Sequence, residues 1–176
     1  MKIVELKKGI TVECPTCGGY GKVWEGTCPD CNGVGDIVLK QVDIKVVVIG
    51  NVAFVNTCPH PINGVYNGEE VVIPPCGYLL NATPEEKFIE EKFGIEFIKT
   101  EFIGTEEGWA FIDAVERDFT LNVKNHVRKT IIIGSAIATK AFPGVCGLTP
   151  MPGFERVAPA LKKMNLNKFT ITEKED

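Results

Sequence analysis

Four cysteines near the start of the chain have the spacing of metal ligands. They lie in two Cys-Pro-x-Cys turns, residues 14–17 and 28–31, and glycines follow each turn at the same offsets. Each turn can point two thiolates at one ion, and two facing turns complete a tetrahedron around Zn²⁺. The sequence therefore predicts one zinc ion with this ligand set: Cys14, Cys17, Cys28 and Cys31.

Disulfide bonds and a redox-active thiol pair are the alternatives for these cysteines. The chain has seven cysteines, an odd number, and its first residues reach charged side chains before an apolar signal segment can build. Both observations favour zinc in a reducing, cytoplasmic setting. Residues 18–27 fit a short hairpin with a strand at 22–24. So small a segment cannot bury a core, and metal binding should supply most of its folding free energy.

A second candidate site lies where the apolar strand 130–133 runs into a small-residue helix that ends near residue 142. A helix N-terminus offers free N–H groups and a positive dipole end to an anion. Basic residues flank this junction, and a histidine between two prolines could line a pocket or cap a turn. The predicted ligand-binding residues are Gly134, Ser135, Lys140, Arg128, Lys129 and His60. The alternative is that a buried strand turning into a short helix needs small residues for packing alone.

The remaining cysteines and the two histidines raise the question of a second metal site or a cysteine nucleophile. A Cys-x-His step can supply two ligands, and Cys with His can form a thiolate nucleophile. We favour the simpler interpretation, in which these cysteines are small buried apolar residues. The residues concerned are Cys58, His60, Cys76, His126 and Cys146. No catalytic residue is assigned, because the sequence shows no matched acid and base.

Charge is distributed unevenly along the chain, whose net charge is −4. Residues 42–116 hold four lysines against thirteen acidic residues, whereas residues 117–168 hold nine basic residues against two acidic ones. The two halves could attract each other, or part of the basic half could face an anion. Residues 1–41 hold five basic and five acidic residues, so the zinc module lacks the clustered positive charge of a nucleic-acid surface.

The elements that position these residues are predicted to be mostly strands, giving an α+β fold with a β-rich mixed sheet and two or three short helices. Strands are expected at 43–49 and 52–56 around a Gly50-Asn51 turn, at 64–66 and 71–73 around Asn67-Gly68, and at 95–103, 109–112, 119–123, 130–133 and 168–171. A helix is expected over 83–94, from Thr83-Pro-Glu-Glu to Gly94. An acidic turn is expected at 104–108 and a long loop at 143–159. The predicted domains are a zinc-binding hairpin module at 1–41, an α/β domain at 42–171 and a tail at 172–176.

Residues 14–35 resemble the cysteine-rich module of DnaJ-type chaperones, whose repeat is CxxCxGxG. A full module of that family has four repeats and two zinc ions. This chain has two repeats and no His-Pro-Asp motif of a J-domain, so we do not expect a co-chaperone. The same residues are similar to anti-TRAP, a small bacterial regulator with two knuckles at this spacing and an apolar strand after them, here 36–39. Anti-TRAP acts by binding another protein, so the resemblance implies a protein-docking role.

Residues from Val52 onward resemble small proteins encoded by tailed bacteriophages. The resemblance lies in the run from Val55 to Ile62 and in the Ile-Pro-Pro-Cys-Gly step that ends at Gly77, where that family has N-L-T-P-H-P-V and I-P-P-S-G. Residues 130–138 and the run Pro-Gly-Phe-Glu-Arg-Val-Ala-Pro are also similar. The family resemblance implies a phage origin without an activity. Because Cys58 and Cys76 stand where that family has Thr and Ser, neither is expected to be its working residue.

These observations favour a zinc-containing binding protein that inhibits or sequesters a host protein or a small anionic nucleotide, in the manner of phage anti-defence proteins. The alternatives are an enzyme acting on a small phosphorylated substrate, a nucleic-acid-binding regulator, and a virion or assembly component. Nucleic acid and membrane are not expected partners. A homo-oligomer is expected, because a two-knuckle module has so little core of its own.

Overall fold

The first sheet is built on a long hairpin. The computed structural model describes residues 1–121, 127–158 and 161–172. Strands β1 (Lys2–Glu13) and β4 (Asp36–Ile49) pair antiparallel along almost their whole length. β5 (Val52–Asn56) turns back from β4, and β10 (Lys129–Ile133) lies parallel to β5. The order across this sheet is β1-β4-β5-β10.

A second sheet has the order β11-β12-β6-β7. Its strands are β6 (Ile62–Tyr66), β7 (Glu69–Ile73), β11 (Gly147–Pro150) and β12 (Met164–Thr170). β6 and β7 form the hairpin predicted around Asn67 and Gly68, whose φ angles of 50° and 85° suit a tight hairpin turn. β12 lies parallel to β6 and antiparallel to β11, so the fold is β-rich with parallel and antiparallel pairs.

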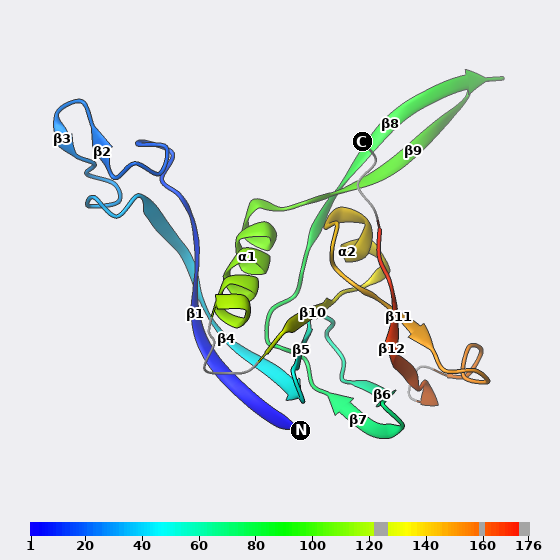
Figure 1. Cartoon of the computed structure of the whole chain (residues 1–176). Helices are drawn as coiled ribbons and strands as arrows, with labels where there is room; N and C mark the ends of the chain where they lie inside the picture. The colour runs from blue at the N-terminus through cyan, green and yellow to red at the C-terminus, as the bar shows by residue number, and fades with distance from the viewer. Residues whose placement is uncertain (122–126, 159–160, 173–176) are drawn as a thin grey trace.

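Two clusters of buried apolar side chains hold the layers together. Helix α1 (Glu106–Leu121) packs beside β1 and β4 (Figure 1) and contributes Phe111, which stacks on Tyr78 with ring centroids 4.2 Å apart. The short helix α2 (Ala136–Ala141) joins the same cluster. The second cluster lies between the two sheets and includes Phe54 from the first and Leu166 from the second.

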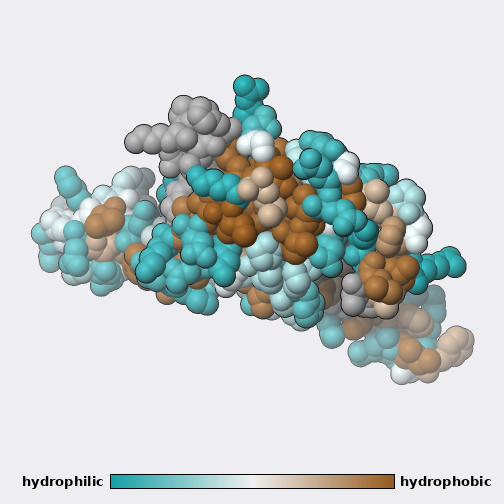
Figure 2. All heavy atoms as spheres, turned by 90° about the horizontal axis from the view of Figure 1, so that it is seen from below, coloured by the Kyte–Doolittle hydropathy of each residue, from teal (hydrophilic) through white to brown (hydrophobic). Residues whose placement is uncertain are grey.

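Two hairpins project from this body in different directions (Figure 1). One is the β1–β4 stem, which carries the cysteine-rich segment with β2 (Lys22–Val23) and β3 (Gly26–Thr27) at its end. The other is formed by β8 (Ala82–Lys92) and β9 (Ile95–Gly104), and we call it the β8–β9 arm. Figure 2 shows hydrophobic residues at both projecting ends as well as in the middle of the face seen from below.

The helix predicted over 83–94 is wrong, because residues 82–92 form β8. The capping pattern at Thr83 and the stripe of Phe88 and Ile89 were typical of a helix, but the strictly alternating strand that follows offers a full-length partner. Phe93 and Gly94, with φ of 55° and 74°, form the turn between the two strands instead of ending a helix. Pairing with β9 therefore prevailed over local helix propensity.

The strand predicted at 109–112 and the acidic turn at 104–108 are also wrong, because α1 begins at Glu106. Thr105 Oγ1 accepts a hydrogen bond from Gly108 N at 3.2 Å, which caps the helix, and Glu106 and Glu107 lie in its first turn. Acidic residues there complement the helix dipole. Of the strand predicted at 119–123, residues 119–121 belong to α1 and the rest lie outside the described residues.

Other predictions are confirmed. Residues 95–103 lie in β9, 130–133 in β10, 36–39 in β4, and α2 follows β10. The β4–β5 hairpin turns at Gly50, as the sequence indicated. The last strand, β12, begins earlier than predicted and ends at Thr170.

The zinc module and the body are continuous through β1 and β4. The predicted boundary between residues 41 and 42 lies inside β4, which runs from the cysteine-rich segment into the body. The long loop predicted at 143–159 contains β11. Residues 173–176 of the predicted tail lie outside the described residues. None of the helices in the described part of the chain has the length and apolar character needed to cross a bilayer.

Candidate metal centre

The four predicted ligands come together in one buried cluster at the end of the β1–β4 stem. All four Sγ atoms lie within 4.8 Å of one another. Sγ atoms from opposite turns are 3.8 Å apart for Cys14 and Cys28 and 3.7 Å apart for Cys17 and Cys31. A tetrahedron with Zn–S bonds of about 2.3 Å has S···S edges of about 3.8 Å. The cluster is therefore one Zn²⁺ site made of four cysteines.

The site has an internal two-fold pattern in which each residue corresponds to the one fourteen positions later. Gly21 N donates to Cys17 Sγ at 3.2 Å, and Gly35 N donates to Cys31 Sγ at 3.3 Å. Cys28 N donates to Gly21 O at 3.0 Å and Cys14 N to Gly35 O at 2.7 Å, so each half is tied to the other. The repeated sequence motif thus folds into two interlocked copies of one knuckle.

Two glycines are required by the close approach of the two knuckles. Gly21 has φ of 69°, and a Cβ there would lie 2.2 Å from Gly33 O. Gly35 has φ of 91°, and a Cβ there would lie 2.3 Å from Gly19 O. A side chain at either position would meet backbone, which cannot move aside without opening the knuckle. The sequence shows these glycines at matching offsets in the two knuckles, but it does not reveal this contact.

The Sγ atoms of Cys17 and Cys31 lie 3.7 Å apart, so the protonation of one thiol affects the pKa of the other. Burial raises the pKa of Cys17 to about 11, and the hydrogen bond from Gly21 N offsets this only in part. At Cys31 burial also raises the pKa, but the Gly35 N–H, the neighbouring thiols and the Gly33 N–H together lower it to about 7. Metal binding requires thiolates, so a Zn²⁺ ion that binds near neutral pH must displace a proton from Cys17.

Two aromatic side chains of the module are exposed. Val23 and Ile37 pack against the cysteine cluster from inside. Trp24, in the turn between β2 and β3, has a relative exposure of 103%, and Tyr20 one of 85%. These two side chains, which we call the aromatic tip, were not predicted from sequence as a functional surface.

The predicted anion-binding residues are only partly brought together. Gly134 and Ser135 follow β10 and start α2, where Ser135 Oγ accepts from Ala138 N at 3.2 Å. Gly134 N is already engaged with Cys146 O at 3.0 Å. Lys140 lies at the other end of the six-residue α2. Two N–H groups at this junction, those of Gly134 and Ala138, are therefore already paired within the chain.

The other basic residues of that set lie at the opposite end of β10. Arg128 N and Lys129 N both donate to Asn51 O, at 2.7 and 3.3 Å. Lys129 is the first residue of β10 and lies six residues before Ser135, a span of roughly 20 Å in extended chain. His60 is exposed, and its carbonyl accepts from Asn56 Nδ2 at 2.8 Å. The structure thus does not gather Arg128, Lys129 and Ser135 around one ligand.

Cys58, Cys76 and Cys146 have the character of structural thiols. Burial raises the pKa of each, to about 11 for Cys76, whose Sγ contacts Tyr78 O at 3.2 Å. Within the described residues, the zinc ligands form the one group of three or more side chains placed to bind a metal ion. His126 lies outside the described residues.

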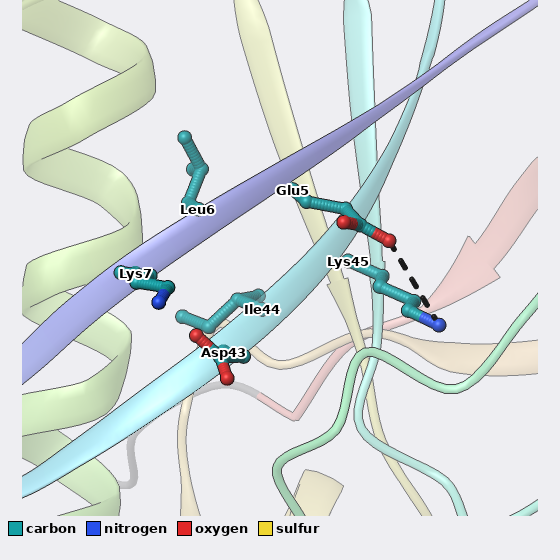
Figure 3. Close-up of a pocket in the computed structure, with 6 residues that line it drawn as sticks. All are labelled: Glu5, Leu6, Lys7, Asp43, Ile44 and Lys45. Atoms are coloured by element: carbon teal, nitrogen blue, oxygen red, sulfur yellow. Dashed lines mark ion pairs between the residues drawn. The ribbon is translucent and has the colours of Figure 1, made fainter.

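A shallow pocket of about 470 Å³ lies on the β1–β4 stem (Figure 3). Its charged lining consists of two cross-strand pairs, Glu5 opposite Lys45 and Lys7 opposite Asp43. Glu5 and Lys45 form an ion pair at 4.0 Å. Because each lysine faces a carboxylate, the charges balance and the pocket does not select an anionic ligand.

The fold and ligand set define a zinc module of the double CxxC type on a β-rich body. Over 35 residues the chain is 49% identical to the chaperone protein DnaJ of Thermoplasma acidophilum. The match covers 20% of this chain, which spans 9% of the length of that curated relative. No protein-family model and no solved structure matches the chain. The cysteine-rich segment is thus a DnaJ-like zinc module.

Proposed function

We propose that this chain is a zinc-containing binding protein that docks onto another protein through the aromatic tip of its zinc module. The observation that carries the proposal is the full exposure of Trp24 and the near-full exposure of Tyr20 on the zinc module. Aromatic side chains bury large areas at little conformational cost and are enriched among the residues that dominate binding energy.

The way in which the aromatic tip is held by the structure supports this role. The zinc ion fixes the knuckles, and the long β1–β4 ladder holds them away from the body (Figure 1). A preorganised tip loses little entropy on binding. The DnaJ relative is a chaperone protein, and this similarity also supports protein binding by the module.

The finer parts of the proposal rest on the resemblances. A phage origin would make the target a host protein that is inhibited or sequestered, as in host take-over or anti-defence. The host cytoplasm is the proposed location, since thiolate zinc sites and free cysteines persist in reducing compartments. A small anionic nucleotide is the weaker proposal, because Arg128 and Lys129 lie far from Ser135.

Comparative capture with single-residue variants tests the docking proposal. The full zinc-loaded chain, the Trp24→Ala variant and a Leu161→Ala control would each be used to capture proteins from a bacterial host lysate. Leu161 is an exposed apolar residue outside the zinc module, so its loss controls for general stickiness. Any captured protein would then be purified, and its affinity for each variant measured by calorimetry.

We expect Trp24→Ala to weaken binding roughly 30-fold, the effect of losing about 2 kcal/mol at a binding hot spot. Leu161→Ala should bind as the unmodified chain does. Equal affinity of the Trp24→Ala variant and the unmodified chain would overturn the assignment of the tip as the docking surface.

A further inference from the structure

The β8–β9 arm stands apart from the two apolar clusters. In the described part of the chain its two strands pair only with each other, from Ala82 opposite Gly104 to Lys92 opposite Ile95. Only its base, including Ala82 and Phe102, packs against the body. An isolated two-stranded hairpin is marginally stable in water. The arm nevertheless extends from the body and exposes large apolar side chains (Figures 1 and 2).

One face of this arm carries an ordered pattern of side chains. Because alternate strand residues point to the same face, β9 presents Ile103, Glu101, Lys99 and Phe97 in a row. The ion pair of Lys99 with Glu101, at 3.0 Å, agrees with this placement. Ile103 and Phe97 are 44% and 46% exposed. The row therefore reads apolar, acidic, basic, apolar from base to tip.

β8 extends the two charged positions into stripes across the arm. Glu85 lies opposite Glu101, and Lys87 lies opposite Lys99. Like charges directly opposite each other on a sheet repel and are destabilising. The ion pair between Lys87 and Glu101, which are diagonal neighbours on the two strands, offsets part of this repulsion. The face thus has an acidic stripe beside a basic stripe. Beyond the acidic stripe Ile103 lies opposite Thr83, and beyond the basic stripe Phe97 lies opposite Glu90.

This pattern is complementary to itself. A two-fold axis that crosses the strands between the stripes would place the acidic stripe of one copy on the basic stripe of another. The same axis would place Ile103 of each copy against Phe97 of its partner. Closed two-fold interfaces have this reciprocal form, in which residue i meets residue j and residue j meets residue i.

We propose that this face of the β8–β9 arm is a homodimer interface, with two copies of the chain packed face to face and their arms antiparallel. The occupant is a second copy because both the charge order and the apolar positions match under the two-fold. The proposal is independent of the docking role of the aromatic tip, which lies at the end of the other hairpin.

Charge-stripe variants test the interface in the full-length, zinc-loaded protein. An acidic variant carries Lys87→Glu with Lys99→Glu, and a basic variant carries Glu85→Lys with Glu101→Lys. A control carries Glu91→Lys with Glu96→Lys, a pair on the opposite face of the arm. Sedimentation velocity over a concentration series would give the dimer dissociation constant for each protein and for an equimolar mixture of the first two.

We expect the unmodified chain and the control to dimerise, and each stripe variant alone to dimerise at least about tenfold more weakly. The mixture should recover a dimer, because an all-acidic face then meets an all-basic one. Ion pairs within one arm cannot produce that recovery. A Phe97→Ser variant, which keeps every charge, should also weaken the dimer and provides a second test should a stripe variant fail to fold.

A monomeric unmodified chain at about 100 μM, a range that detects weak interfaces, would overturn the proposal. So would a dimer that both stripe variants leave unchanged. Failure of the mixture to dimerise, with both variants folded, would show that the stripes do not face each other across the interface.

Discussion

At the scale of single residues, the zinc centre depends on pairs that play the same part in each knuckle. Cys17 and Cys31 accept peptide N–H groups from Gly21 and Gly35, and each of those glycines approaches the opposite knuckle too closely for a Cβ. The ligands could be predicted from sequence because CxxC spacing alone fixes them. The interlock could not, since it depends on backbone contacts between residues far apart in the motif.

Substituting Gly21 with Ala should disrupt the interlock. The added Cβ meets Gly33 O, so we expect zinc affinity to fall roughly 30-fold, equivalent to about 2 kcal/mol of strain. Gly26→Ala is the matched control, because Gly26 also has positive φ but no atom lies within 4 Å of its Cβ position. Competition with a chromogenic chelator measures both affinities. Equal losses in the two variants would mean that φ, and not the contact, sets the effect.

Zinc affinity should fall as the pH falls. In the metal-free site the pKa of Cys31 is lowered to about 7 and that of Cys17 is raised to about 11, so protons compete for both sulfurs on the acid side. Zinc binds the deprotonated form, so its contribution to stability is present at alkaline pH and is lost on acidification. Below about pH 7 we expect affinity to drop roughly tenfold or more per pH unit. A chelator titration at several pH values measures this, and a flat profile would contradict the thiolate assignment.

At the scale of elements, the sequence predicted correctly those turns and strands whose signals lie within a short stretch of the chain. The turns at Gly50 and Asn67-Gly68 and the strand at 95–103 were predicted correctly. Residues 83–92 were predicted as a helix because a capping pattern and an apolar stripe occur together there. These residues form a strand because they pair with β9, which lies beyond the turn at Phe93. Local helix propensity does not take that partner into account.

The turn of the β8–β9 arm is predicted to be strained. Phe93 has φ of 55°, a left-handed conformation that a bulky side chain disfavours, and its relative exposure is 102%. Asn is the preferred residue before Gly in such hairpin turns. Phe93→Asn should therefore stabilise the arm by about 1 kcal/mol, which slows amide hydrogen exchange along β8 and β9 about fivefold. Exchange rates equal to those of the unmodified chain would show that Phe93 stores no strain.

The shared strand β4 limits how far unfolding should spread when zinc is lost. In a Cys14→Ser, Cys31→Ser double variant we expect residues 14–35 to unfold, because the knuckles have little core beyond the cysteines. The β4–β5 hairpin should persist, since Val46 and Phe54 belong to the body clusters. Amide hydrogen exchange resolves the two regions. Loss of protection from amide hydrogen exchange throughout β5 would indicate that the zinc module and the body fold as one cooperative unit.

At the scale of the whole molecule, a body with two apolar clusters supports two hairpins that end in exposed hydrophobic residues (Figures 1 and 2). The charge asymmetry seen in the sequence has a structural location, since the acidic stretch includes the β8–β9 arm. The residues of the predicted anion site do not all lie together, because Arg128 and Lys129 are at the start of β10 and Ser135 is at the α2 junction beyond its end. The two proposals together assign the body the role of a scaffold that presents two binding surfaces, the aromatic tip and the β8–β9 arm.

Native mass spectrometry of the purified chain most directly tests the claim that the four cysteines hold one zinc ion. We predict a mass corresponding to one zinc ion per chain, with loss of that ion in the Cys14→Ser, Cys31→Ser variant. The zinc is then removed without any reducing agent, and the mass is measured at once. We expect this mass to show all seven thiols free. A chain that holds no zinc, or one whose mass shows the cysteines of the two knuckles joined as disulfides, would contradict the account.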